Sequence, residues 1–477
     1  MTNDFVGREQ ELVALQEFYT GRESALVPIY GRRRVGKSEL ILQFLKGKTG
    51  VYFLGKKAQA GLQIREFLKE AATVLHEPLL GRYAARDWKE ALATVTERLR
   101  GGEKLVIVLD EFQWIVETSP GLPSILQELW DRQWKADGRI MLILCGSYIG
   151  FMEREVLGSK SPLFGRRSGQ ILLRPFGYRE AALFHSSYST VDHARTYFIC
   201  GGVPLYLRCF SPQRSVENNI VTNLLTQYSA LYQEPDFLLR EELREVPNYY
   251  AVLMAIASGK TSHAGIAQST GLDSRALHYY LKQLVDLGYV ARRFPLSDVR
   301  PPRTNVRYIL EDPLLRFWFR FVYPNTSFAL QMGPQAAYRA RVKPGLDAYF
   351  GTCFERLCRE ALPALYRQEG VQAAFQVGEY WDKTVQIDVV GLREDNWTDL
   401  GECKWGVIRS PKRIEQEFTH RIERYPNARG ATLTKRVFTR RREPRPSRSD
   451  SQVLWHGLED LYAVRESGRR SRRVAKR

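Results

Sequence analysis

The stretch ALVPIYGRRRVGKSELILQFL, residues 25–45, decides the fold of the first part of the chain. It begins with a strand-like apolar run at 25–30, continues with the pattern GxxxxGK[ST] and ends in a helix pattern over residues 39–45. A strand, a glycine-rich loop and a helix in this order bind phosphate, because backbone N–H groups and the helix N-terminus face the anion. We therefore predict an ATP site here.

Every residue of this loop is assigned to the ATP site. Lys37 is expected to reach the β and γ phosphates, and the Ser38 hydroxyl is expected to ligate Mg²⁺. The assigned residues are Gly31, Arg32, Arg33, Arg34, Val35, Gly36, Lys37 and Ser38. A chance glycine turn is the alternative interpretation, but the strand and helix on either side of the loop argue against it.

Two later strand patterns end in polar groups. The run 105–109 ends at Asp110 and Glu111, and the run 140–145 ends at Gly146 and Ser147. Ligands of α/β proteins bind at the carboxyl ends of parallel strands. Asp110 is expected to hold Mg²⁺ through water, and Glu111 to orient or deprotonate the attacking water. Ser147 is expected to sense the γ-phosphate, with a plain strand-end turn as the alternative.

The order of strand and helix patterns predicts three folded domains. Alternating short apolar runs and helical patterns are typical of an α/β domain with a parallel sheet. Helical periodicity then takes over, and a second α/β unit follows. The expected domains are a P-loop ATPase domain at 1–210, a helical and winged helix-turn-helix domain at 211–330, a nuclease-like α/β domain at 340–440 and a basic tail at 441–477.

Composition indicates a multidomain globular protein with an anionic partner. The 477 residues exceed what one hydrophobic core usually supports. The net charge is +18, and residues 405–477 carry 20 Lys and Arg against 8 Asp and Glu. Such a basic excess favours nucleic acid through counterion release, although a solvated tail without a partner is the alternative. No export signal or apolar span is seen, so we expect a cytoplasmic protein without a membrane partner.

The region 262–288 has a helix-turn-helix pattern around Gly271, with Asp273 or Ser274 as N-cap of the second helix. Two short strand patterns at 289–294 and 307–310 predict a wing. If the second helix enters a major groove, its outward side chains contact DNA. The expected contacts are Arg275, His278, Tyr279 and Lys282 on the helix and Arg292 and Arg293 on the wing, with Arg300, Arg303 and Arg307 nearby. Winged helices also serve as protein-contact modules, so a protein partner remains the alternative.

The C-terminal region contains a D…ExK pattern at hairpin spacing, formed by Asp388, Glu402 and Lys404. Side chains alternate along a strand, so Glu402 and Lys404 share a face that Asp388 can approach from the neighbouring strand. Two carboxylates suit Mg²⁺ or Mn²⁺, and a lysine beside them can activate water or stabilise a pentavalent phosphate. Glu355, on an upstream helix, is expected to add a metal-side carboxylate. Surface ion pairs are the alternative interpretation.

These motifs together resemble the STAND branch of AAA+ ATPases, and within it the prokaryotic "archaeal ATPase" proteins. The shared segments are FVGRE at 5–9, the phosphate loop, Asp110-Glu111, PLFGR at 162–166 and GGVP at 201–204. The resemblance implies that Val6 and Gly7 border the adenine, Arg166 senses the γ-phosphate and Pro204 closes the base pocket. An ion pair with a local carboxylate is the alternative for Arg166.

The C-terminal pattern resembles the PD-(D/E)xK nucleases, which implies a restriction-endonuclease-like fold and phosphodiester cleavage. Two functions follow for the whole chain. One is an ATPase that binds DNA and cleaves it at a metal-dependent C-terminal site. The other is a STAND-type nucleotide switch whose winged helix and nuclease-like domain only bind nucleic acid or protein, including a second copy of the chain.

Overall fold

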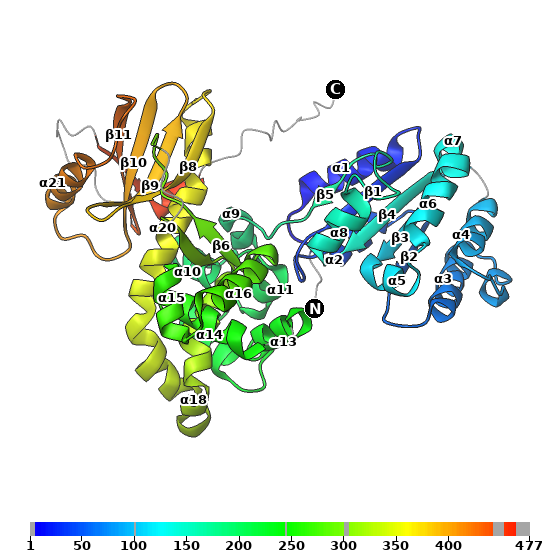
Figure 1. Ribbon diagram of the computed structural model, residues 1–477, viewed down its shortest axis with the longest axis horizontal. Helices are drawn as coiled ribbons and strands as arrows, with labels where there is room; N and C mark the ends of the chain where they lie inside the picture. The colour runs from blue at the N-terminus through cyan, green and yellow to red at the C-terminus, as the bar shows by residue number, and fades with distance from the viewer. Residues whose placement is uncertain (1–4, 100–101, 244–245, 300–304, 442–452, 464–477) are drawn as a thin grey trace, which may run out of the picture. The chain divides into compact units, whose positions relative to one another are not determined.

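The computed structural model describes residues 5–99, 102–243, 246–299, 305–441 and 453–463. The expected wing residues Arg300 and Arg303 and most of the basic tail lie outside these ranges. The chain divides into two compact units (Figure 1). The first is Met1–Phe176 with Val203–Leu205, and the second is Gly177–Gly202 with Tyr206–Arg477. The division therefore does not fall at residue 210.

The first unit contains a parallel five-stranded sheet in the order β2-β3-β4-β1-β5. Its strands are β1 Ala25–Tyr30, β2 Gly50–Leu54, β3 Leu105–Asp110, β4 Ile140–Gly146 and β5 Ile171–Leu172. β1, β3 and β4 are buried at every position. Continuous apolar runs of this kind are typical of parallel strands covered on both faces. The prediction of an α/β domain with a parallel sheet is confirmed.

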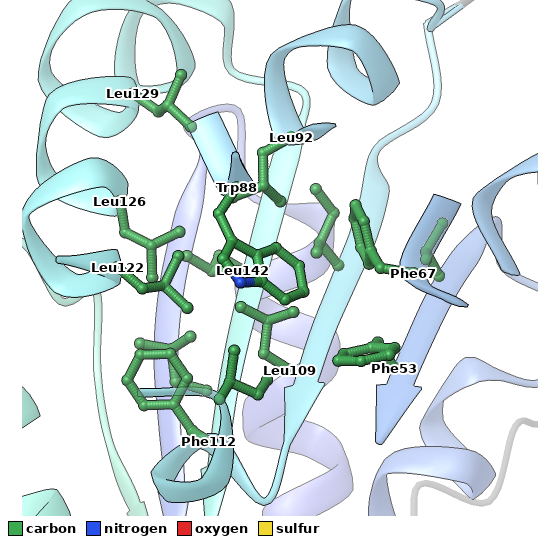
Figure 2. Close-up of a cluster of buried hydrophobic side chains, with 14 of the residues drawn as sticks. Phe53, Phe67, Trp88, Leu92, Leu109, Phe112, Leu122, Leu126, Leu129 and Leu142 are labelled. Carbon is green, nitrogen blue, oxygen red and sulfur yellow. The ribbon is translucent and has the colours of Figure 1, made fainter. Parts of the chain in front are cut away.

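Helices cover both faces of this sheet. They are α1 Glu9–Thr20, α2 Lys37–Leu45, α3 Ala60–Val74, α4 Trp88–Glu97, α5 Phe112–Thr118, α6 Leu122–Leu129, α7 Lys135–Asp137 and α8 Ile149–Met152. On one face, the Trp88 ring contacts the rings of Phe53 and Phe67, with centroids 5.7 and 5.5 Å away (Figure 2). The other face packs on a separate core that includes Val106 and Ile143. Both faces are therefore closed, and polar groups collect at the carboxyl edge.

The second unit begins with helices and a two-stranded antiparallel hairpin. Its first elements are α9 Tyr178–Ala182, α10 Thr190–Cys200, α12 Val216–Ile220, α13 Glu234–Glu242, α14 Val246–Ala257, α15 His263–Thr270, α16 Ser274–Asp286, β6 Val290–Arg293 and β7 Arg307–Leu310; α11 Pro204–Cys209 begins in the first unit. Gly271, at φ +70°, ends α15. The Asp273 carboxylate caps α16 by accepting from the backbone N–H groups of Arg275 and Ala276.

A mixed five-stranded sheet follows, in the order β12-β11-β10-β9-β8. Its elements are α17 Pro313–Phe317, α18 Thr326–Met332, α19 Pro334–Ala337, α20 Lys343–Gln368, β8 Phe375–Trp381, β9 Gln386–Arg393, β10 Trp397–Lys404, α21 Pro411–Ile422, β11 Thr432–Thr439, β12 Val453–Gly457 and α22 Leu458–Ala463. β8, β9 and β10 run antiparallel, whereas β10, β11 and β12 run parallel. β12 is a strand of this sheet and α22 follows it directly, although the sequence placed both in the basic tail.

The long helix α20 and the shorter α21 contact this sheet through different side chains. Tyr366 of α20 packs so close to Gly391 that a Cβ there would lie 2.0 Å from the phenol oxygen. Phe418 of α21 is fully buried with Leu400 and Val437. Because side chains alternate along a strand, Leu400 and Glu402, two residues apart on β10, point to the same face. Phe418 packs with Leu400, so α21 lies over the face that carries Glu402.

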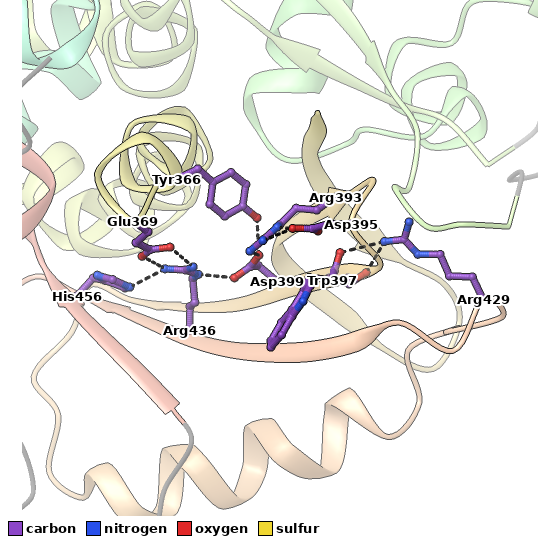
Figure 3. Close-up of polar contacts among 10 residues, drawn as sticks. Tyr366, Glu369, Arg393, Asp395, Trp397, Asp399, Arg429, Arg436 and His456 are labelled. Carbon is purple, nitrogen blue, oxygen red and sulfur yellow. Dashed lines mark hydrogen bonds and ion pairs between the residues drawn. The ribbon is translucent and has the colours of Figure 1, made fainter. Parts of the chain in front are cut away.

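A buried ion network joins α20 to this sheet (Figure 3). Arg436 is 2% exposed and Asp399 is 1% exposed. The Arg436 guanidinium donates to Asp399 at 2.6 Å and to both oxygens of Glu369 at 2.6 and 2.7 Å. The Tyr366 phenol donates to the second oxygen of Asp399 at 2.6 Å. Each buried charge therefore has a partner, which is what makes its burial tolerable.

Asp399→Ala is expected to lower the free energy of unfolding by about 3–5 kcal/mol, because the buried Arg436 guanidinium loses the carboxylate of Asp399 as an ion-pair partner. The matched control is Asp395→Ala, since Asp395 forms a more exposed pair with Arg393 and is expected to cost at most about 1 kcal/mol. Urea unfolding followed by circular dichroism measures both variants. Equal losses would contradict a structural role for this network.

Candidate nucleotide site and carboxylate site

The loop between β1 and α2 has the backbone that a phosphate site requires. Gly31 and Gly36 have φ values of +155° and +90°, and Arg34 is left-handed at +69°. A Cβ on Gly31 would lie 2.2 Å from the carbonyl oxygen of Leu173, so only glycine fits there. The loop leads directly into the N-terminus of α2. The first backbone N–H groups of a helix have no acceptor within the helix, so they are available to a phosphate.

Lys37 lies over this loop and is almost fully buried. Its ammonium donates to the carbonyl oxygens of Gly31 and Arg32, at 3.0 Å each. Burial lowers the pKa of Lys37, while the charges of Glu111 and Asp110 oppose that shift. The ammonium is thus held across the loop by two neutral carbonyl oxygens. An anionic phosphate would accept a stronger hydrogen bond from the ammonium than these oxygens do.

Ser38 and Asp110 meet at the carboxyl edge of the first sheet. The Ser38 hydroxyl donates to Asp110 Oδ2 at 2.6 Å, and Asp110 is 0% exposed. The phenol of Tyr52, on β2, donates to the same oxygen. A hydroxyl beside a carboxylate is an oxygen donor set that fits Mg²⁺. Tyr52 was not predicted from the sequence. The one feature that could have indicated it is a phenol hydroxyl within an otherwise apolar strand.

The structure also brings Glu111, Gln113 and Ser147 together. Glu111 has a left-handed backbone, at φ +48°, between β3 and α5. The Ser147 hydroxyl donates to Glu111 Oε2 at 2.7 Å, and the Gln113 amide donates to the same oxygen. Gln113 was not expected from the sequence. These contacts hold the Glu111 carboxylate at the ends of β3 and β4, where the sequence places the attacking water.

The N-terminal segment is tied to the phosphate loop by Arg8. Its guanidinium donates to the carbonyl oxygens of Val35 and Arg174, at 3.1 and 2.7 Å, and stacks 3.9 Å from the centre of the Phe176 ring. Gly7 has φ +69°, and a Cβ there would lie 2.9 Å from Phe176. The neighbouring Val6 is half-buried. In the sequence, Arg8 was recognised only as part of the FVGRE segment, so this anchoring was not predicted.

The structure places Pro204 and Arg166 differently with respect to the loop. A Cβ on Gly36 would lie 3.6 Å from the Pro204 ring, so Pro204 packs next to the loop. Arg166 instead makes a two-pronged pair with Asp131, at 2.8 and 2.7 Å. It also donates to two carbonyl oxygens of its own segment, those of Pro162 and Phe164. In the structure, Arg166 therefore pairs with a local carboxylate, which is the alternative stated above for this residue.

Asp388 and Glu402 are adjacent across β9 and β10. The strands pair antiparallel up to Val389 and Gly401, and the next residue of each strand is Asp388 and Glu402. The Cys403 backbone N–H donates to Asp388 Oδ2 at 3.0 Å. The hairpin therefore brings together the two carboxylates that the sequence pattern paired.

Two cations meet the same oxygen of Glu402. Lys404 Nζ and Arg421 Nη2 each lie 2.6 Å from Glu402 Oε1. The other oxygen, Oε2, is buried and has no hydrogen-bond partner among the residues that the structure describes, and Glu402 as a whole is 1% exposed. A buried carboxylate oxygen without a donor is costly, so this oxygen is suited to a cationic ligand.

Glu355, Glu379 and Arg359 complete the charged cluster. The Arg359 guanidinium donates to the backbone oxygen of Asp388 at 2.6 Å and lies 3.6 Å from Glu379. Burial, followed by the charge of Asp388, raises the pKa of Glu355 to about 8. Burial and the charge of Glu402 raise the pKa of Asp388 to about 6. Burial and mutual repulsion thus favour the protonated forms of Glu355 and Asp388, and a bound cation would oppose that preference.

The described residues contain no group of three or more His, Cys, Asp or Glu side chains arranged to hold a metal ion. Lys404 and Arg421 already contact Oε1 of Glu402. The oxygen donors of Asp388 and Glu402, with Oε2 unpartnered, still fit a hard divalent cation.

Glu379, Arg359 and Arg421 were missed from the sequence. Glu379 lies at a β-bulge between Gly378 and Tyr380, and bulges redirect a side chain in a way that strand alternation does not predict. Arg359 is one helical turn beyond Glu355 on α20. That spacing was the one available signal, since residues four apart lie on the same helix face.

The side chains expected to contact DNA are exposed on α16 and β6. Leu277, Leu281 and Leu284 are buried on the opposite side of α16. The exposed residues are Arg275, His278, Tyr279, Lys282, Arg292 and Arg293. Arg293 pairs with Glu311 at 2.6 Å, and Arg307 stacks 4.3 Å from the Trp381 ring. Arg307 is thus engaged with the second sheet.

None of the helices in the described part of the chain combines the length and hydropathy needed to cross a lipid bilayer.

Known proteins are similar to two parts of the chain. Residues 5–209 match the model of an ATPase domain predominantly from Archaea, and residues 318–416 match a family of archaeal and bacterial proteins of unknown function. An uncharacterized protein of Methanocaldococcus jannaschii is 28% identical over 407 residues, which are 85% of this chain and 88% of the relative. An uncharacterized ATP-binding protein of the same organism is 46% identical over 44 residues, 9% of this chain and 75% of that protein.

Among solved structures, the Walker-type ATPase of Pyrococcus abyssi superposes with a TM-score of 0.50 at 19% identity, covering 67% of this chain and 97% of that one. At this identity the likeness concerns the fold. It agrees with the parallel sheet and the phosphate loop described above. Residues 5–209 are therefore similar in sequence to an ATPase domain found predominantly in Archaea, and the fold of the chain is similar to that of a Walker-type ATPase.

Proposed function

We propose that this chain binds ATP with Mg²⁺ at the loop between β1 and α2 and hydrolyses it. The observation that carries the proposal is the 2.6 Å contact between the Ser38 hydroxyl and Asp110. It joins the end of the phosphate loop to the carboxyl end of a neighbouring strand. Bound Mg²⁺ would neutralise charge on the phosphates, and Ser38 and Asp110 would hold it.

Each remaining residue has a role that follows from its position. Lys37 binds the β and γ phosphates, and Glu111 orients and deprotonates the attacking water. Ser147 and Gln113 hold the Glu111 carboxylate in place. Gly7 and Pro204, with Val6, border the base, since Pro204 packs against Gly36.

Lys37→Ala is expected to weaken ATP binding at least about tenfold, because a charge-assisted contact to phosphate is worth about 1.5–3 kcal/mol. Lys56→Ala is the matched control, since Lys56 is an exposed lysine of the same unit that pairs with Glu66. Equilibrium binding of a fluorescent ATP analogue measures both. Equal affinity of Lys37→Ala and the unchanged chain would remove the nucleotide site from this loop.

We further propose that the Asp388–Glu402 site cleaves phosphodiester bonds with a divalent cation. The unpartnered, buried Oε2 of Glu402 beside Asp388 favours this second function. A bound cation would supply an activated water and stabilise charge on the phosphate. Asp388 and Glu402 would hold it, and Lys404 would stabilise the charge that develops on the phosphate. Glu355, which the sequence also assigned to the metal, does not complete a group of three ligands with them in the described structure.

For the nucleic-acid partner, we propose DNA bound by a winged helix formed by α14, α15 and α16 with β6 and β7. The capped helix α16 presents exposed Arg275, His278, Tyr279 and Lys282, the side chains suited to phosphate and base contacts. The basic C-terminal segment would add sequence-independent affinity through counterion release. In the alternative, a STAND-type switch, these surfaces bind DNA or protein without any cleavage.

Incubation of the full chain with supercoiled plasmid decides between the two functions. Divalent cation (Mg²⁺ or Mn²⁺) and ATP are varied separately, and nicked and linear products are resolved on a gel. Cation-dependent product supports the nuclease proposal. Intact plasmid, with single-stranded DNA and RNA also uncut, leaves the ATPase as a switch and the second site as a binding surface.

A further inference from the structure

Arg421 lies outside the D…ExK pattern, yet it contacts the central carboxylate of the second site. It comes from the last turn of α21, 19 residues after Glu402. Phe418 and Ile422, on either side of it in the helix, are buried against the sheet and fix its position. The contact with Glu402 is therefore set by the packing of α21.

Two cations contact one oxygen of Glu402 and leave the other oxygen to a ligand. Lys404 and Arg421 both approach Oε1 at 2.6 Å, while Oε2 has no hydrogen-bond partner among the described residues. Asp388 adds a second negative charge beside Glu402, so the two cations balance two carboxylates, and a divalent cation bound through Oε2 would leave Arg421 available to an anion. Among the described residues, Glu402 is the single ion-pair partner of Arg421.

Exposure separates the two parts of the cluster. The side chain of Glu402 is 1% exposed, whereas those of Arg421 and Lys404 are 33% and 40% exposed. The carboxylates therefore form the interior of the site, and the two cations form its solvent-facing rim. An anionic ligand arriving from solvent meets the cations first. Arginine suits such a ligand because its planar guanidinium donates two parallel hydrogen bonds to phosphate.

We propose that Arg421 is a phosphate-binding residue of this site, which pairs with Glu402 in the ligand-free chain and contacts the phosphodiester when a divalent cation occupies the carboxylates. The inference rests on the proposed nuclease function. It adds a substrate-binding side chain from α21, and it makes Arg421 a competitor of the cation for Glu402. Cation binding and phosphodiester binding would therefore be coupled at this site.

The test uses the full chain and a fluorescein-labelled dinucleotide with a single internal phosphodiester. Binding is measured by fluorescence anisotropy with Ca²⁺, and Mn²⁺ binding is measured separately by calorimetry. Arg421→Gln is expected to weaken probe binding about tenfold or more, the loss typical of one charge-assisted contact, and to leave Mn²⁺ affinity equal or higher. Arg421→Lys should recover part of the probe affinity.

Arg424→Gln is the matched control, because Arg424 is exposed two residues after the end of the same helix and contacts His420. It should bind probe and Mn²⁺ as the unchanged chain does. Equal probe affinity in Arg421→Gln and the unchanged chain would overturn the proposal. A parallel loss of Mn²⁺ affinity would also overturn it, since Arg421 would then only position Glu402. If Arg421→Gln loses probe binding while the unchanged chain cuts no plasmid, the phosphate-binding role of Arg421 stands and the proposed nuclease function is rejected.

Discussion

Asp388→Ala and Glu402→Ala are each expected to reduce cation-dependent DNA cleavage to background while ATP binding stays unchanged. The two carboxylates lie side by side on β9 and β10, and Asp388 is fixed by the Cys403 backbone N–H at 3.0 Å. Removal of either leaves too few oxygen donors for a hard divalent cation. The nucleotide site lies in the other compact unit, so its residues are untouched. Plasmid cleavage and nucleotide binding measure the two outcomes.

Lys404→Ala separates chemistry from cation binding at the same site. An ammonium is no metal ligand, so Mn²⁺ binding should remain, while cleavage falls by about 10²–10⁴-fold if the lysine assists water activation or phosphate charge. Lys412→Ala, an exposed lysine on the neighbouring α21, is the control for loss of one positive charge. Cleavage that survives Asp388→Ala would exclude this site as its source.

Glu111→Gln is expected to slow ATP hydrolysis by about 10²–10⁴-fold, the range for loss of a general base, while ATP binding is retained. The amide keeps the size of the side chain and one acceptor oxygen for Ser147, which donates to Glu111 at 2.7 Å. It cannot take a proton from water. Phosphate release and nucleotide binding, measured on the same preparation, separate turnover from affinity.

The control for this variant is Glu117→Gln, an exposed glutamate on α5, which should turn over ATP as the unchanged chain does. Turnover that persists in both Glu111→Gln and Lys37→Ala would reject hydrolysis at this loop. Turnover that persists in Glu111→Gln alone would assign water activation to another side chain.

Much of the first unit followed from local sequence pattern. The apolar run 25–30 is β1, and the runs 105–109 and 140–145 each extend by one residue into β3 and β4. These strands are buried throughout, so their sequence signal is continuous and strong. The second sheet was harder to predict. β8, β11 and β12 are only partly buried, and Glu379 lies at a bulge that breaks the alternation on which strand prediction depends.

The sequence by itself determined the phosphate loop, the carboxylates that end β3 and the D…ExK spacing, because each of these depends on neighbouring residues in one strand, turn or hairpin. Only the tertiary structure decided which distant side chains complete the sites. Tyr52 reaches Asp110 across 58 residues, and Arg421 reaches Glu402 of β10 from the helix α21. Arg166, which the resemblance assigned to the nucleotide, pairs with Asp131, 35 residues away. The physical reason is that an ion pair depends on which charges packing brings within contact, and helix and strand periodicity do not encode that choice.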